Sequence, residues 1–229
     1  MTDYVFAPPA PPALPVLGTG QLFPVRRIYC VGRNYAEHAR EMGHDPDREP
    51  PFFFQKNPDN LVLGDVFPYP PLSADVHHEV ELVVALGAGG ADLSEAEAEA
   101  AVFGYAVGLD MTRRDLQAAA KKAGRPWELA KAFEASAPCG PITPRAALSA
   151  PLAAGPVTLA VNGEIRQKGD LADLVWSVPE TIAKLSELFT LAPGDLVFTG
   201  TPAGVGPVRR GDRLRAEIAT LPPLEVEVR

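Results

Sequence analysis

Cysteine is scarce in this chain of 229 residues, which contains only Cys30 and Cys139. Two cysteines build no disulfide framework, so a reduced, cytoplasmic setting is expected. No apolar stretch reaches the length of a membrane span, and no signal peptide opens the chain. Positive charge is also low, because 21 Lys and Arg face 29 Asp and Glu. The resulting net charge of −8 disfavours nucleic acid and anionic membranes as partners.

Proline and glycine are abundant, with 25 and 20 residues, which indicates many turns and short strands rather than long helices. The apolar content of 46% is typical of a globular chain with a sizeable core. Six prolines fall within residues 1–24. We expect this segment to form an extended arm that lies on the body or on a partner subunit, with a disordered tail as the alternative. Residues 25–229 show no repeat and no linker and are expected to form one domain.

The main candidate site lies in residues 75–86, which have the sequence DVHHEVELVVAL. Apolar side chains alternate from residue 80 onward, and this pattern predicts a half-buried strand. Side chains two positions apart point to the same face of a strand, so His77, Glu79 and Glu81 are expected to project together. Neighbouring carboxylates repel each other. This face therefore lies either in water or around a bound cation.

A third carboxylate ends another apolar segment. Residues 104–111 (GYAVGLDM) predict a buried strand with Asp110 near its end, where an unpaired charge would be costly. Residues 112–115 form a capping pattern for a helix that stops at Gly124. Asp110 precedes that cap, so capping does not account for it. Two interpretations stay open, namely a third metal carboxylate or an ion-pair partner for Arg114.

Four further ionisable residues have roles that the local pattern leaves open. Residues 36–43 predict a short helix on which His38 and Glu41 share a face, either as an oriented base or as an ordinary surface pair. Lys56 ends an apolar run and either holds an anionic ligand or lies in solvent. Lys131 stands among apolar residues, where its ammonium either reaches solvent or is buried for a purpose.

Six motifs occur together in order: CVGRNY…H from residue 30, HEVEL from 78, GLDMT…RD from 108, LAKAF from 129, VNGE…Q from 161 and PGD…TGTPAGVGP from 193. Together they resemble the fumarylacetoacetate hydrolase family, and its acylpyruvate and fumarylpyruvate hydrolase branch in particular. The proline-rich lead-in, joined to residues 23–30, is most similar to bacterial fumarylpyruvate hydrolases of the gentisate route. The resemblance implies a mainly β fold with short helices (α+β), a mixed β-roll or sandwich that is usually a homodimer.

The resemblance also implies roles for individual residues. The family's metal ligands fall on Glu79, Glu81 and Asp110, whose hard oxygen atoms suit Mg²⁺ or Mn²⁺. The family's water-activating pair falls on His38 and Glu41. The positions that contact the substrate, or are candidates for its far carboxylate, are Arg33, Lys56, Arg114, Gln117, Lys131 and Thr201.

The implied reaction is hydrolysis of a carbon–carbon bond in an acylpyruvate (a 2,4-diketo acid), so that fumarylpyruvate gives fumarate and pyruvate. In this interpretation the metal polarises the diketone, His38 oriented by Glu41 deprotonates water, and Lys131 helps to hold the pyruvate enolate. Two alternatives stay open. One is an isomerase or decarboxylase of hydroxymuconate-type acids or of oxaloacetate on the same metal site, and the other is a non-catalytic metal-binding module. The His38–Glu41 pair favours hydrolysis.

Overall fold

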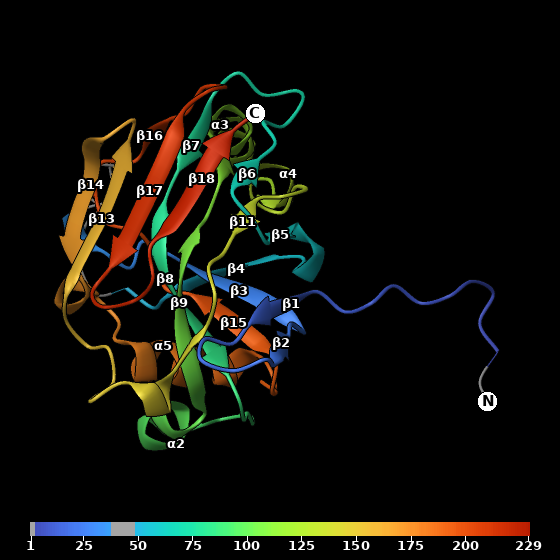
Figure 1. The fold of residues 1–229 in the computed structure, drawn as a ribbon, viewed down its shortest axis with the longest axis vertical. Helices are drawn as coiled ribbons and strands as arrows, with labels where there is room; N and C mark the ends of the chain where they lie inside the picture. The colour runs from blue at the N-terminus through green and yellow to red at the C-terminus, as the bar shows by residue number, and fades with distance from the viewer. Residues whose placement is uncertain (1–2, 38–48) are drawn as a thin grey trace.

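The structure is a computed structural model that describes residues 3–37 and 49–229. It is mainly β with a few short helices, which confirms the expected fold class. Two large sheets form the body, with α-helices at one end of it and others towards the opposite end (Figure 1). No helix among the described residues is long and apolar enough to cross a membrane.

The largest sheet contains the strands that bring the expected metal carboxylates together. Its strand order is β12–β9–β8–β15–β3–β4, in which β15 runs parallel to β3 and the other pairs are antiparallel. The strands are β3 (Arg27–Gly32), β4 (Phe52–Lys56), β8 (Val80–Leu86), β9 (Val102–Leu109), β12 (Thr143–Pro144) and β15 (Asp195–Phe198).

The second large sheet has the order β14–β13–β17–β18–β6. Its strands are β6 (Val66–Phe67), β13 (Pro156–Val161), β14 (Glu164–Asp170), β17 (Arg213–Ile218) and β18 (Leu224–Val228). Asn162 and Gly163 join β13 to β14 with φ values of 52° and 84°. Positive φ at both central residues is what a type I′ turn requires, so the Asn-Gly pair confirms the hairpin that the sequence predicts.

Smaller sheets complete the fold around these two. They contain β10 (Thr112–Arg113), β7 (Val76–His78) and β16 (Gly206–Pro207); β11 (Ala137–Pro138) with β5 (Leu61–Val62); and β1 (Ala13–Pro15) with β2 (Leu22–Pro24). Single-turn helices lie at η1 (Pro58–Asn60), η2 (Arg145–Ala147) and η3 (Leu171–Asp173).

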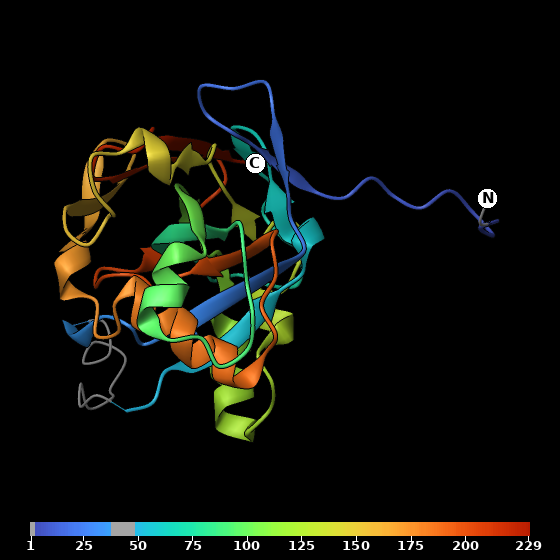
Figure 2. The same cartoon turned by 90° about the horizontal axis from the view of Figure 1, so that it is seen from below.

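The α-helices are α2 (Glu95–Ala100), α3 (Arg114–Ala123), α4 (Glu128–Lys131) and α5 (Val178–Leu188). Both views show α2 and α5 side by side (Figures 1 and 2). Helix α3 ends before Gly124, which has a left-handed φ of 62°, as expected. The expected capping pattern at residues 112–115 is wrong, because Thr112 belongs to β10 and its hydroxyl donates to the carbonyl of Asp110 instead.

Apolar side chains fill both sides of the six-stranded sheet. Val80, Leu82 and Val84 of β8 belong to one buried cluster, whereas Val83 and Ala85 belong to the other. All residues of β8 are buried, so the expected half-burial of this strand is wrong. The alternation marks two different cores rather than a core face and a solvent face, since strands that are covered on both sides bury both sets of side chains.

The N-terminal segment has two parts. Residues 3–12 run away from the body as an extended chain (Figures 1 and 2). Residues 13–24 instead form the β1–β2 hairpin, which places Leu14, Val16 and Phe23 in a buried cluster with strands of the six-stranded sheet. This hairpin therefore contributes apolar side chains to the core.

Candidate active site

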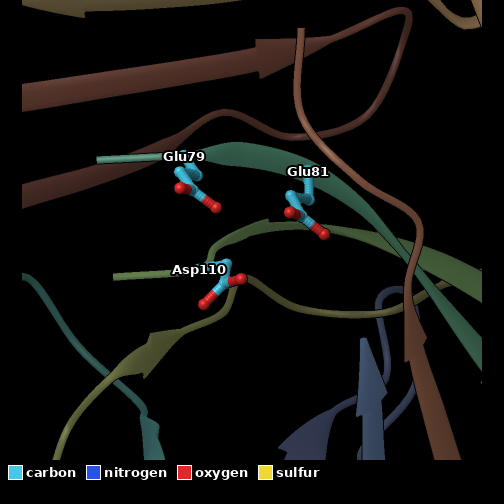
Figure 3. Close-up of side chains that lie close together, drawn as sticks. All are labelled: Glu79, Glu81 and Asp110. Atoms are coloured by element: carbon cyan, nitrogen blue, oxygen red, sulfur yellow. The ribbon is translucent and has the colours of Figure 1, made fainter. Parts of the chain in front are cut away.

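Three buried carboxylates meet where β8 and β9 lie side by side (Figure 3). Glu79 directly precedes β8, Glu81 is its second residue, and Asp110 directly follows β9. The backbone N–H of Asp110 donates to the carbonyl of Glu79 at 2.8 Å, which aligns the two strand ends. One carboxylate oxygen from each residue lies within 4.8 Å of the others. The structure thus brings together the three residues that the sequence analysis assigned to a metal.

The strand that the sequence predicts over residues 75–86 is divided into two at Glu79. Strand β7 pairs with β10 and β16, whereas β8 belongs to the six-stranded sheet. Glu79 and Glu81 nevertheless point into the same space (Figure 3). Glu81 pairs with Gly108 of β9. Glu79 lies at the break between β7 and β8, where its carbonyl accepts from the N–H of Asp110. The three carboxylates therefore lie at a junction between two sheets.

His77 is linked to this centre through Arg114. The Nε of Arg114 donates to Nδ1 of His77 at 3.3 Å, and Nε2 of His77 lies 2.9 Å from Oδ1 of Asp75. Arginine only donates hydrogen bonds, so Nδ1 is the accepting nitrogen and the proton resides on Nε2. Burial lowers the pKa of His77, and the Arg114 guanidinium lowers it further. A neutral His77 therefore orients Arg114.

The three carboxylates fit a divalent cation. Burial raises the pKa of Glu81 well above its ordinary value, and the carboxylates of Asp110 and Glu79 raise it further. Oδ1 of Asp110 is buried and accepts no hydrogen bond from any residue that the structure describes, although an ammonium lies close to it. Hard oxygen atoms at this spacing suit Mg²⁺ or Mn²⁺, whose charge would offset the repulsion within the cluster. Glu79, Glu81 and Asp110 can thus hold such a metal.

Lys131 adds a buried cation to the cluster from the last residue of α4. Its Nζ donates to Oε2 of Glu79 at 2.8 Å and to Oδ2 of Asp110 at 2.6 Å. Burial alone would lower the pKa of Lys131, but the carboxylates of Asp110 and Glu79 raise it to about 12. The ammonium is therefore buried and charged at neutral pH, which excludes the alternative in which it reaches solvent.

Helix α3 presents Arg114 and Gln117 to the same site. Arg114 pairs with Oε1 of Glu79 through Nη2 and donates to Oε1 of Gln117 through Nη1 at 2.6 Å. Because α3 begins at Arg114, residues three apart on its first turn share the face that lies over Glu79. Asp110 forms ion pairs with lysines, and its ion pairs within the described residues do not include Arg114. These ion pairs do not support the alternative in which Asp110 is the partner of Arg114, which pairs with Glu79 instead.

Lys56, one of the residues expected to lie near the substrate, lies beside the carboxylate cluster. Its side chain is fully buried, and its Nζ lies 2.8 Å from Oδ1 of Asp110 and 3.3 Å from the carbonyl of Met111. The same ammonium also donates to the carbonyl of Lys131. Lys56 therefore holds Asp110 and the end of α4 in place, and it is not among the residues that line the pocket.

Replacing Lys56 by methionine is expected to destabilise the metal-free protein. The change removes one partner of a buried carboxylate, and breaking a buried ion pair from one side costs about 3–5 kcal/mol. We expect the free energy of unfolding in urea to fall by about 3 kcal/mol. Lys184→Met is the control, because Lys184 is an exposed partner of Glu187 and such pairs contribute about 0.5 kcal/mol. Equal losses in the two variants would contradict this role of Lys56.

A single pocket contains the carboxylate cluster together with most of the residues expected to bind substrate. Its lining includes the expected residues Arg33, Arg114, Gln117, Lys131 and Thr201, and also Phe54, Lys121 and Trp127, which the sequence analysis did not assign. His38 and Glu41 lie outside the described residues. Residues 31–33, which precede them, line the pocket.

Two buried amides that the sequence analysis left without a role hold the walls of this site. Gln167 donates to the Thr201 hydroxyl at 2.8 Å and accepts from the backbone N–H of Val80 at 3.1 Å. Asn34 donates to the carbonyls of Thr199 and Trp176 at 2.9 and 3.0 Å. Both residues belong to the motifs that carry the family resemblance, so the sequence could have singled them out. Their hydrogen-bond partners could not be predicted, because an uncharged amide gives no sign in the sequence of which group it contacts.

Gly200 connects the same wall to the carboxylate cluster. Its N–H donates to Oε2 of Glu81 at 2.8 Å. The φ of Gly200 is 97°, a conformation in which a side chain is strained. A Cβ there would also lie 2.9 Å from the Cβ of Asn34. Glycine at this position therefore allows the backbone to approach and orient the carboxylate of Glu81.

The fold and the site define a mainly β enzyme with a buried carboxylate centre that can hold a divalent metal. The chain belongs to the fumarylacetoacetate hydrolase family, since residues 27–229 match the family model described as fumarylacetoacetate (FAA) hydrolase C-terminal. The crystal structure of fumarylpyruvate hydrolase from Pseudomonas aeruginosa in complex with Mn²⁺ and pyruvate is similar to it, with 53% identity, 99% of each chain covered and a TM-score of 0.96.

Curated relatives bear a different activity in their names. The oxaloacetate tautomerase YcgM of Escherichia coli (strain K12) is 43% identical over 84% of this chain and 88% of its own length. The mitochondrial oxaloacetate tautomerase FAHD1 of Bos taurus is 42% identical over 84% of this chain and 87% of its own. Family membership thus establishes the fold and the kind of site, but relatives with different named activities share both, so it does not determine the substrate.

Proposed function

We propose that this protein is a metal-dependent hydrolase that cleaves fumarylpyruvate, an acylpyruvate, into fumarate and pyruvate. The observation that carries this proposal is the pocket in which the carboxylate cluster meets Lys131 and Arg114. A cation-lined pocket around such a cluster suits the carboxylate and 2-keto oxygen of a pyruvate group. The likeness to the Pseudomonas aeruginosa enzyme, solved with Mn²⁺ and pyruvate, supports the same assignment.

Mg²⁺ or Mn²⁺ bound to Glu79, Glu81 and Asp110 would supply Lewis-acid polarisation of the diketone. Lys131 is charged and held between two carboxylates, so its ammonium is already oriented to stabilise negative charge on the departing enolate oxygen. Arg114, fixed by its contacts with Glu79 and Gln117, helps to hold the substrate carboxylate.

The water-activating step is assigned to His38, with Glu41 as its orienting partner. His38 removes a proton from water, and the hydroxide oxygen attacks the acyl carbonyl carbon. The bond between that carbon and the adjacent methylene then breaks, which leaves fumarate and the pyruvate enolate. Protonation of the enolate carbon, with the proton that His38 took from water, gives the methyl group of pyruvate. One water is consumed for each pair of products.

Oxaloacetate tautomerisation is the second candidate function, and the names of the Escherichia coli and bovine relatives favour it. This reaction uses the same chelating half of the substrate but moves a proton between carbon and oxygen without consuming water. A metal centre with a charged lysine suits either reaction. The two candidates are therefore distinguished by products rather than by the metal site.

The test is a comparison of both reactions on one protein preparation that contains Mg²⁺ or Mn²⁺. We expect fumarylpyruvate to lose its enol absorbance while fumarate and pyruvate form in equal amounts, with a higher kcat/KM than for oxaloacetate tautomerisation. Acetylpyruvate and maleylpyruvate complete the panel. Rapid oxaloacetate tautomerisation without fumarate and pyruvate formation would instead assign the second function.

A further inference from the structure

One face of α3 leads from the carboxylate cluster to the outer part of the pocket. Arg114, Gln117 and Lys121 occupy positions i, i+3 and i+7 of this helix, which share a face, and all three line the pocket. Arg114 contacts Glu79 directly. At 1.5 Å per residue, Lys121 lies about 10 Å further along the helix axis than Arg114. The face therefore carries one cation beside the metal centre and a second at a defined distance from it.

An aromatic wall joins the two ends of this pocket. The Nζ of Lys131 lies 5.1 Å from the ring centroid of Phe54, and the rings of Phe54 and Trp127 are 6.0 Å apart. The Nζ of Lys121 lies 5.1 Å from the ring centroid of Trp127. A flat conjugated chain packs well against such rings, while cations at either end suit its charged groups. The aromatic wall thus extends from Lys131 to Lys121 and offers a surface on which such a chain can lie.

Within the part of the chain that the structure describes, the charge on Lys121 is not balanced by a direct partner. Its ammonium forms no hydrogen bond or ion pair with residues 3–37 or 49–229. Burial lowers the pKa of Lys121, and the charges of Arg114 and Arg33 lower it further. Arg33 lines the same pocket and has a left-handed φ of 62°, which is unusual for a residue other than glycine. An anion bound here would relieve the repulsion between these cations.

We propose that Lys121, assisted by Arg33, forms a second anion-binding site that receives the carboxylate at the acyl end of a dianionic acylpyruvate. The inference rests on the proposed function and deepens it, because it names the residues that select the acyl group. Fumarylpyruvate has seven carbons, so six bonds separate its carboxylate carbons. Six bonds equal two residues of extended chain, about 7 Å. The distance between the two substrate carboxylates, added to the reach of a lysine side chain, matches the separation of about 10 Å between Arg114 and Lys121 along the axis of α3.

The second anion site distinguishes among substrates that share the chelating half. Acetylpyruvate has a methyl group where fumarylpyruvate carries its acyl-end carboxylate. The two carboxylate carbons of oxaloacetate are separated by three bonds, about 4 Å, so its second carboxylate stays near the metal centre. Lys121 therefore contributes to binding of fumarylpyruvate and not to binding of the two shorter acids.

The test compares Lys121→Met with Lys122→Met, because Lys122 is the next residue and is exposed. Hydrogen bonds between charged groups change binding by about 10- to 100-fold. We expect Lys121→Met to lower kcat/KM for fumarylpyruvate by this factor, mainly through KM, and to leave acetylpyruvate within about twofold. Lys121→Arg keeps the charge and is expected to retain most of the activity. Lys122→Met is expected to behave as the wild type.

The outcomes separate this inference from the proposed function. If the wild type hydrolyses fumarylpyruvate and the two methionine variants do so equally well, the anion site is overturned and the hydrolase remains. If the wild type hydrolyses neither acid, the proposed function fails, and calorimetric dissociation constants for fumarylpyruvate with Mg²⁺ decide about the site. Weaker binding in Lys121→Met than in Lys122→Met then supports the site, whereas equal binding overturns it.

Discussion

Glu81→Gln is expected to weaken metal binding strongly and, with it, to lower turnover. The side chain keeps its size, but the cluster loses one of three negative charges and one hard anionic oxygen. Changes in residues that merely support metal ligands already cost about 10- to 100-fold in affinity, so loss of a ligand should weaken Mn²⁺ binding by about 100-fold or more. Isothermal titration of the metal-free protein with Mn²⁺ measures the effect.

The matched control is Glu217→Gln, which changes an exposed carboxylate on β17. It should bind Mn²⁺ as the wild type does. Thermal unfolding gives a second readout, since a ligand that binds only the folded state raises Tm. We expect Mn²⁺ to raise the Tm of the wild type and of the control but not that of Glu81→Gln. A variant that bound Mn²⁺ with wild-type affinity would remove Glu81 from the metal site.

Short-range patterns single out the three carboxylates, whereas the resemblance to the family is what assigned them together to a metal. Glu79 and Glu81 share a face by alternation, and Asp110 is conspicuous as a charge that ends an apolar strand. The division of the strand at Glu79 was not predictable, since it depends on pairing of β7 with residues 112–113 and 206–207. Those partners are distant in sequence, and the local alternation continues past the break.

The roles of two lysines also depend on tertiary packing. Lys56 ends a strand, and the local pattern allows either solvent or a ligand for its ammonium. Its actual partners are Asp110 and a carbonyl on α4, which only the folded chain brings together. Lys121 is seven residues after Arg114 on a helix that the sequence predicts. The helical period therefore predicts that these two side chains share a face. The place of Lys121 beside Trp127, at the end of the aromatic wall, depends on tertiary packing and is seen only in the structure.

His38→Ala is expected to lower kcat for fumarylpyruvate hydrolysis by about 100- to 10,000-fold, the range typical of a general base. Mn²⁺ affinity should be unchanged, because Glu79, Glu81 and Asp110 remain in place. Steady-state kinetics and titration with Mn²⁺ measure the two quantities on the same preparation. Unchanged hydrolysis would remove His38 from the reaction, whereas loss of Mn²⁺ binding would show that the variant has damaged the metal centre.

A second histidine variant separates activation of water from placement of the substrate. His77→Ala removes the imidazole that accepts a hydrogen bond from Arg114, so Arg114 is less firmly oriented but the reacting groups remain. Its main effect should therefore be a higher KM, whereas the effect of His38→Ala should be on kcat. Because tautomerisation consumes no water, His38→Ala should retain more oxaloacetate tautomerase activity than hydrolase activity. Equal losses in both reactions would instead mean that His38 serves proton transfer common to the two.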